Sequence, residues 1–106
     1  MKKWKPISAV EFSQLFEAQV AELSNRQKEI FARFSVTPWR ATIRRSESAG
    51  DEFVYVVAEY DDEVLYFDDV EYGFNISQIS KDGRILDPGG SQNTLSEAVS
   101  YYFPKS

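Results

Sequence analysis

Between residues 39 and 86 the chain consists of short strand-like segments separated by polar turns, and this pattern restricts the fold more than any other feature. Apolar residues alternate with polar ones from Trp39 to Arg44, which is the period of a β-strand. Residues 53–60 are rich in β-branched and aromatic side chains and predict a second strand. Further strands are predicted over 64–67 and 72–79, and a short fifth one over 84–86 after the hairpin signal Lys81-Asp82-Gly83. Connections this short favour an antiparallel meander.

Helices are predicted before and after the strands in the sequence. Ser8-Ala9-Val10-Glu11 fits a capping box, after which apolar residues recur at helical spacing. Ser24 either caps a second helix or marks a bend in the first, and helix is expected to end before Pro38. Thr94-Leu95-Ser96-Glu97 is another capping box and opens a short C-terminal helix. We therefore predict one α+β domain over residues 1–106, with an N-terminal helix or two, an antiparallel meander of four to five strands and a short C-terminal helix.

The Asp61-Asp62 turn predicts the register of the two central strands. If these two residues form the whole turn, the opposed pairs are Tyr60 with Glu63, Val57 with Tyr66, and Val56 with Phe67. One face then holds the expected core, Val54, Val56, Ala58, Leu65 and Phe67. The other face, either covered by a helix or open to a partner, holds Phe53, Tyr55, Val57, Glu59, Val64 and Tyr66, together with Trp39 and Ile43. A slip of one residue would exchange the two faces.

The composition excludes several kinds of chemistry. The sequence has no Cys and no His, so it offers no disulfide, no thiolate and no imidazole base, and a Ser-His-Asp relay cannot form. Residues 87–91 superficially resemble a phosphate loop but lack the Lys-Ser or Lys-Thr ending. We assign no catalytic residue and no cofactor, and we expect the protein not to be an enzyme.

Charge is distributed unevenly along the chain. The net charge is −5, with +5 over residues 1–45 and −10 over residues 46–106, and the ten acidic residues between Glu47 and Glu71 are not interrupted by a base. The two halves either mark an interaction surface or neutralise each other in the folded chain. A concentrated negative field favours cations and basic protein surfaces, so we expect no nucleic-acid binding in spite of Arg40, Arg44 and Arg45.

The segment from Tyr66 to Asn75, YFDDVEYGFN, is the most distinctive part of the sequence. Gly73 between two aromatic residues indicates a bulge or a close approach of backbone, and Asn75 is expected to stabilise a turn through its side chain. The segment resembles one in small bacterial proteins of uncharacterised function, in which an aromatic pair, acids and Gly-Phe-Asn occupy the middle of an α+β domain. The resemblance extends over about residues 53–103. It implies that fold and supplies no catalytic residues.

We expect a non-catalytic protein-binding module whose acidic and aromatic surface meets a basic protein partner. An immunity or inhibitor protein that masks a basic toxin or nuclease surface is one concrete form of this hypothesis. The candidate contact residues are Trp39, Tyr55, Tyr66, Asp68, Asp69, Glu71 and Tyr72. One alternative is a structural domain that forms a homodimer through its open sheet face. Another is a small metal-dependent hydrolase that uses the clustered carboxylates.

The expected location is the cytoplasm. The N-terminal residues are basic but are not followed by an apolar run of signal-peptide length. No segment approaches the roughly 20 apolar residues that span a bilayer, so we expect no membrane association.

Overall fold

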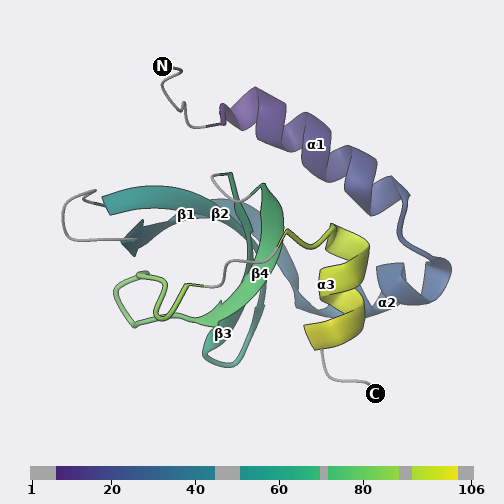
Figure 1. Ribbon diagram of the computed structural model, residues 1–106. Coiled ribbons are helices and arrows are strands. Elements are labelled where there is room, and N and C mark those ends of the chain that lie inside the picture. Colours follow the sequence, from purple (N-terminus) through teal and green to yellow (C-terminus); the bar gives the residue numbers. More distant parts are fainter. Residues whose placement is uncertain (1–6, 45–50, 70–71, 89–91, 103–106) are drawn as a thin grey trace.

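The computed structural model describes residues 7–44, 51–69, 72–88 and 92–102 of the chain. Its elements follow the order α1 (Ala9–Ala21), α2 (Asn25–Phe34), β1 (Ser35–Arg44), β2 (Asp51–Tyr60), β3 (Glu63–Asp68), β4 (Gly73–Gln78) and α3 (Leu95–Tyr102). The strands form an antiparallel meander in the order β1-β2-β3-β4, which confirms the predicted α+β class. The three helices lie along one side of a strongly curved sheet (Figure 1).

The helix starts follow from local sequence. Ser8 and Glu11 form the predicted capping box of α1, each side chain accepting the backbone N–H of the other residue at 3.1 Å. Ser24 and Gln27 form the same arrangement at α2, so the chain makes two helices rather than one bent helix. Thr94 and Glu97 repeat it at α3. Each box satisfies N–H groups that a helix start leaves without a partner.

Strand β1 begins four residues earlier than its alternating pattern, at Ser35. The pairing of β1 with β2 is irregular between Ser35 and Trp39, and Pro38 lies within this irregularity. Proline has no N–H to donate to a neighbouring strand. It is tolerated here because the pairing of this edge strand is irregular at this position. The predicted end of the helix before Pro38 is confirmed, because α2 ends at Phe34.

The predicted register of β2 and β3 is wrong beyond the turn. Tyr60 does lie opposite Glu63, but Val56 lies opposite Tyr66 and Tyr55 opposite Phe67, because the register shifts between Val56 and Ala58. The extra residue of this bulge is Val57. A bulge of one residue moves the side chains of β2 that lie farther from the turn than the bulge to the other face. The predicted core set is therefore divided between the two faces.

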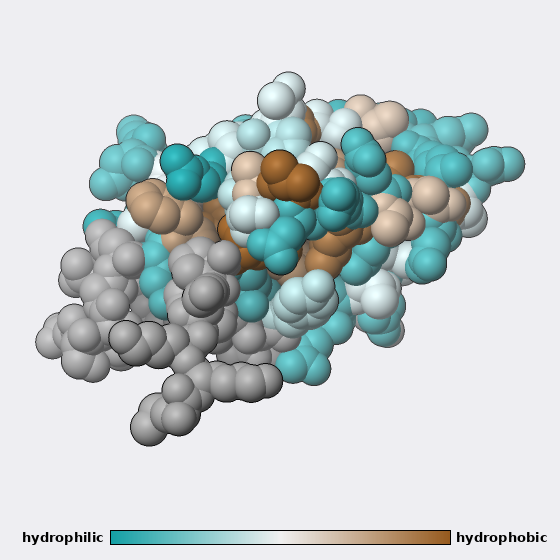
Figure 2. Space-filling model, turned by 90° about the horizontal axis from the view of Figure 1, so that it is seen from above, coloured by the Kyte–Doolittle hydropathy of each residue, from teal (hydrophilic) through white to brown (hydrophobic). Residues whose placement is uncertain are grey.

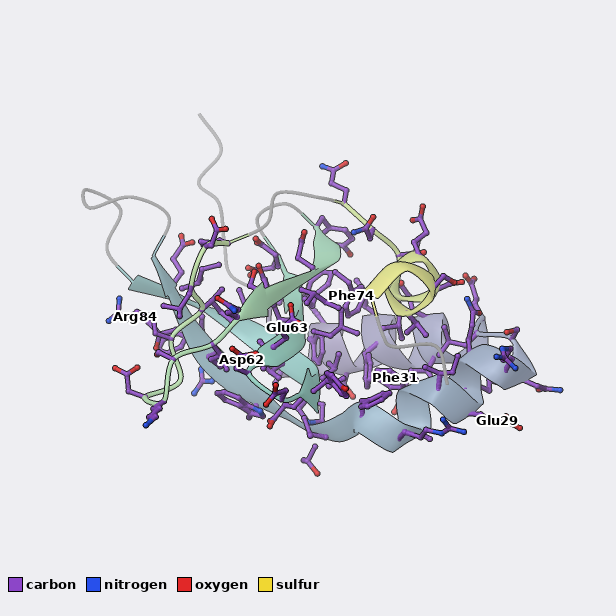
Figure 3. All side chains as sticks on the ribbon, turned by 90° about the horizontal axis from the view of Figure 1, so that it is seen from below. Glu29, Phe31, Asp62, Glu63, Phe74 and Arg84 are labelled. Atoms are coloured by element: carbon purple, nitrogen blue, oxygen red, sulfur yellow. The ribbon has the colours of Figure 1, made fainter. Side chains whose placement is uncertain are left out.

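Two hydrophobic cores result, one on each face of the sheet. The first lies under the helices and contains Phe12, Leu23, Phe31, Val57, Ala58, Leu65, Phe67, Phe74, Leu95, Ala98 and Val99. Figure 3 shows Phe31 of α2 and Phe74 of β4 in the layer between helices and sheet, with Glu29 on the outer side of α2. The second core contains Ala41, Ile43, Val54, Val56, Val64, Tyr66 and Ile85. Val54 and Val56 therefore pack with Tyr66 rather than with Phe67.

The second core is enclosed because the sheet curls and its two ends are joined by residues 83–86, here called the clasp. Toward β1, Thr42 N donates to Gly83 O at 3.1 Å and Ile85 N donates to Thr42 O at 2.8 Å. Toward β4, Leu86 N donates to Gln78 O at 2.8 Å. The predicted fifth strand is thus replaced by isolated bridges, from Thr42 to Arg84 and from Ile79 to Ile85. The clasp covers backbone edges that would otherwise be open.

Two glutamine side chains join the helices to one another. Gln19 Oε1 of α1 accepts Leu95 N at 2.7 Å, at the start of α3. Gln27 Nε2 of α2 donates to Ser96 Oγ at 2.9 Å and to Ser100 Oγ at 2.8 Å. These contacts link residues more than 65 positions apart in sequence and fix α3 against the other two helices. In the part of the chain that the structure describes, no helix is long and apolar enough to cross a membrane.

Candidate functional site

Two of the predicted contact residues lie inside the protein. Tyr66 and Asp68 are both 0% exposed. The Tyr66 hydroxyl group lies 2.9 Å from Ser77 Oγ, which in turn donates to Asp87 O at 3.2 Å. Tyr66 keeps the face that alternation along β3 gives it, and the bulge at Val57 brings Val54 and Val56 onto that face to form the second core around it. The expectation that Tyr66 and Asp68 contact a partner is therefore corrected: Tyr66 belongs to the core, and Asp68 is buried at the end of β3.

Two other predicted contact residues help α1 to pack against the sheet. The Tyr55 ring is half-buried and stacks on Phe12, with ring centroids 4.3 Å apart and planes inclined by 7°. Asp69 Oδ2 accepts the backbone N–H of Ile7 at 2.8 Å, just before α1 begins. Both contacts hold the first half of α1 against the sheet, so a structural function accounts for these two side chains.

Of the remaining three predicted contact residues, the structure describes Tyr72 and Trp39, which lie apart from each other. Tyr72 is 62% exposed, and its ring meets Phe67 edge-on at 5.4 Å. Its φ of 58° lies in the left-handed region, which is strained for a bulky side chain. Trp39 is half-buried near the opposite end of the sheet, and Glu71 lies outside the described residues. The predicted residues therefore do not form one surface.

Asn75 also differs from its prediction. It lies within β4, opposite Tyr66, and is 2% exposed, so it is part of a strand and not of a turn. The prediction for Gly73 is confirmed in the form of a close approach. A Cβ atom at Gly73 would lie 2.4 Å from the Cα of Gln92.

An acidic surface does exist, at the other end of β3 from Tyr72. We call it the acidic turn, and it consists of the exposed side chains Glu59, Asp61, Asp62 and Glu63. The turn between β2 and β3 lies at the lower end of the sheet in Figure 1, away from α1. Asp62 and Glu63 are seen side by side at this turn in Figure 3.

The backbone of the acidic turn is well defined. Asp61 adopts a φ of 57°, a left-handed conformation that Asp tolerates better than most residues. Asp62 O accepts Ile79 N at 2.8 Å, and Asp62 Oδ2 accepts Gln78 Nε2 at 3.4 Å. These bonds tie the turn to the end of β4, where the chain enters the clasp. The carboxylates are therefore displayed on a fixed backbone.

Two aromatic side chains flank the acidic turn. Tyr60 is 45% exposed and meets Phe34 edge-on, with centroids 5.1 Å apart. Trp39 Nε1 donates to Glu59 Oε2 at 2.8 Å, and its ring lies beside Gly83 of the clasp. Sequence reasoning missed Tyr60 and all four carboxylates of the acidic turn as contact residues, although they fall within the acidic stretch from Glu47 to Glu71. The signal that could have found them is the turn itself, which places neighbouring acids at one end of a hairpin.

One further carboxylate lies in the neighbouring turn before the clasp. Asp82 accepts a hydrogen bond from the Ser80 hydroxyl group, and this bond lowers the pKa of Asp82 below its ordinary value. The charge of Arg84 lowers this pKa further, and Lys81 and Arg84 offset the negative charge of Asp82, so this turn does not extend the acidic turn. Among the residues that the structure describes, no group of three acidic side chains is arranged to hold a metal ion. The arrangement suits electrostatic attraction of a basic surface rather than coordination of a cation.

No protein-family model, curated protein or solved structure matches the chain. The geometry of the described residues is therefore the basis for the proposals that follow.

Proposed function

We propose that the protein is a non-catalytic protein-binding module that presents the acidic turn to a basic surface of a protein partner. The observation that carries this proposal is the set of four exposed carboxylates on one hairpin, next to a half-exposed tyrosine. Carboxylates arranged this way attract a basic partner and increase the rate of association. Tyr60 adds the contact area that aromatic side chains supply at interfaces.

The partner surface that best fits is rich in Lys or Arg. An immunity or inhibitor protein that covers the basic surface of a toxin or nuclease is a concrete form of this function, and the cytoplasm is the proposed compartment. Trp39 supports the site indirectly, because its indole N–H holds the Glu59 carboxylate in place at 2.8 Å. The proposal retains the function expected from the sequence but moves its site from Trp39, Tyr55 and residues 66–72 to residues 59–63.

The test reverses two charges and keeps the backbone bonds of the turn. Asp62→Lys and Glu63→Lys are suitable because both side chains are exposed and Ile79 N still bonds to the backbone oxygen of residue 62; the bond lost is the 3.4 Å one from Gln78 Nε2 to Asp62 Oδ2. Asp61 stays, since its φ of 57° suits Asp, and Glu59 stays because it accepts the Trp39 indole N–H. The matched control is Glu17→Lys with Glu22→Lys, which makes the same change of charge at exposed positions of α1 and its C-terminal cap.

A partner captured from a cell extract would be identified by mass spectrometry, purified, and titrated by calorimetry against each variant. We expect the double reversal at the acidic turn to weaken binding at least about ten-fold and to reduce its dependence on salt, while the α1 variant binds like the wild type. Equal effects of the two double variants would indicate that only net charge matters. Affinity that is insensitive to both salt and charge reversal would exclude the acidic turn as the interface.

A further inference from the structure

A second surface, separate from the acidic turn, combines an apolar groove with a positive charge. The groove has a volume of about 200 Å³ and lies between the first half of α1 and strands β1 and β2. Its lining residues are Ala9, Phe12, Ser13, Phe16, Pro38 and Tyr55. Figure 2 shows the side of the molecule on which α1 lies, where hydrophobic residues reach the surface between hydrophilic ones.

The aromatic lining of the groove is a stack of rings. Phe12 stacks on Tyr55 with planes inclined by 7°, and Phe16 stacks on Phe12 with planes inclined by 10°. Phe12 is only 3% exposed, so the half-buried rings of Tyr55 and Phe16 form the accessible part of this stack. A further aromatic ring gains most from edge-on contact or offset stacking with these two rings.

The size of the groove limits the ligand. Sites for drug-sized ligands are usually about 300–1,000 Å³, whereas an apolar cavity of about 150 Å³ accepts benzene. At about 200 Å³ the groove has room for one aromatic ring and a short chain. Ser13, on the α1 side, is the only lining residue with an aliphatic hydroxyl group.

Arg40 supplies a positive charge at the border of this groove. Arg40 lies directly opposite Tyr55 in the register of β1 and β2, so the two side chains share a face of the sheet. The Arg40 side chain is exposed, and its guanidinium carbon lies 5.2 Å from the centre of the Phe53 ring. Arg40 thus offers beside the groove a charge opposite in sign to that of the acidic turn.

We propose that the groove binds a small aromatic carboxylate, with its ring against the half-buried Tyr55 and Phe16 rings and its carboxylate on the Arg40 guanidinium. An anion is favoured because Arg presents several N–H donors in a geometry that matches a carboxylate. The ring supplies burial of apolar surface, and the ion pair supplies orientation. This site is independent of the acidic turn and of the proposed protein partner.

The test is an NMR titration of backbone amides in the full chain with phenylpropionate. Phenylpropylamine and phenylpropionamide carry the same ring with a positive charge or none. We expect saturable shifts at residues 9–16, 38–43 and 53–55 with a Kd on the order of millimolar, as for a ligand of this size. The amine and the amide should bind up to about five-fold more weakly, which is the effect of one exposed ion pair.

Two variants locate the site. Arg40→Gln should weaken phenylpropionate about five-fold, whereas Arg33→Gln, which removes the same charge from an exposed position of α2, should not. Ser13→Leu should abolish binding by filling the groove, and the dispersion of its amide signals shows whether it folds. Asp62→Lys with Glu63→Lys should leave the binding unchanged, so failure of this proposal is distinguishable from failure of the proposed function.

Three outcomes would overturn the proposal. Equal binding of the acid, the amide and the amine would show an apolar groove that accepts any ring, including a side chain of a partner protein. Equal loss of affinity in the two arginine variants would show that the charge acts at long range. Absence of saturation at millimolar concentrations would show that the groove is not a ligand site.

Discussion

Replacement of Gly73 by alanine is predicted to destabilise the protein strongly, because there is no room for a Cβ atom at this position. That atom would lie 2.4 Å from Gln92 Cα, 2.6 Å from Gln92 C and 2.9 Å from Asn93 N. All three contacts are with backbone, which cannot rotate away as a side chain can. Residues 92 and 93 would have to move away from β4 by about 1 Å to reach ordinary van der Waals distance.

The size of the effect follows from what this movement breaks. Phe74 N donates to Asn93 O at 2.8 Å, and Asn93 Nδ2 donates to Phe74 O at 3.2 Å. Each bond contributes about 1 kcal/mol, and overpacking costs about 1–3 kcal/mol more. Alanine is itself favoured over glycine in a strand by about 0.5–1 kcal/mol. The expected loss of unfolding free energy is therefore about 2–4 kcal/mol, a large part of the typical 5–15 kcal/mol.

Urea denaturation followed by circular dichroism measures this loss, and thermal unfolding should show Tm lowered by roughly 10–20 °C. The matched control is Gly83→Ala. Gly83 has a φ of 84°, but a Cβ atom there would lie 3.6 Å from the nearest Trp39 ring atom, an ordinary contact. Only backbone strain remains, so we expect this control to lose about 1–2 kcal/mol.

The reasoning would be refuted if Gly73→Ala were as stable as the wild type, or if it lost less stability than Gly83→Ala. Either result would mean that residues 92 and 93 move away from β4 at no cost. The start of α3 would then not be positioned by this contact.

Two further predictions follow from single hydrogen bonds. Tyr66→Phe removes the hydroxyl group 2.9 Å from Ser77 Oγ and should lower the free energy of unfolding, measured in urea, by about 1–2 kcal/mol. Binding of a basic partner should stay unchanged. A loss of binding without a loss of stability would show that Tyr66 contacts the partner. The pKa of Glu11 is lowered from 4.5 by hydrogen bonds from the Ser8 backbone N–H and the Ser8 hydroxyl group. Because the folded pKa lies below the unfolded one, the stabilising effect of Glu11 is present above pH 4.5 and is lost as pH falls through the folded pKa. Ser8→Ala removes the hydroxyl group and keeps the backbone N–H, so it should raise the pKa of Glu11 only in part in an NMR titration, and an unchanged value would contradict the contribution of the hydroxyl group.

Most predictions that depend on neighbours in sequence were confirmed, although the turn expected at Asn75 was not. The predicted capping boxes at Ser8 and Thr94 are arrangements of residues three positions apart, so the chain there contains all the groups that form them. Ser24, which the sequence left open between a cap and a bend, forms a third box. The Asp61-Asp62 turn is local in the same sense, and Tyr60 lies opposite Glu63 as predicted. Helix, turn and strand identity were predictable at these positions because the deciding contacts are short-range.

The prediction that extended the pairing next to the turn along the whole length of both strands was wrong. Alternation assigns Val56 and Phe67 to one face, but the bulge at Val57 places Val56 with Tyr66. Nothing in the local sequence around Val57 marks a bulge, because every residue from Val54 to Ala58 is suited to a buried strand. The bulge allows β2 to supply apolar side chains to both cores.

The sequence by itself determined the α+β class, the helix starts at Ser8 and Thr94, the Asp61-Asp62 turn, the need for glycine at position 73 and the accumulation of acidic residues between Glu47 and Glu71. Only the tertiary structure decided which residues are exposed. The bulge brings Val54 and Val56 against Tyr66, the clasp closes the curled sheet, and packing of α1 covers Tyr55 but leaves a groove beside it. The physical reason is range: caps and turns are formed within a few residues, whereas burial depends on which distant segments meet, such as Thr42 with the clasp.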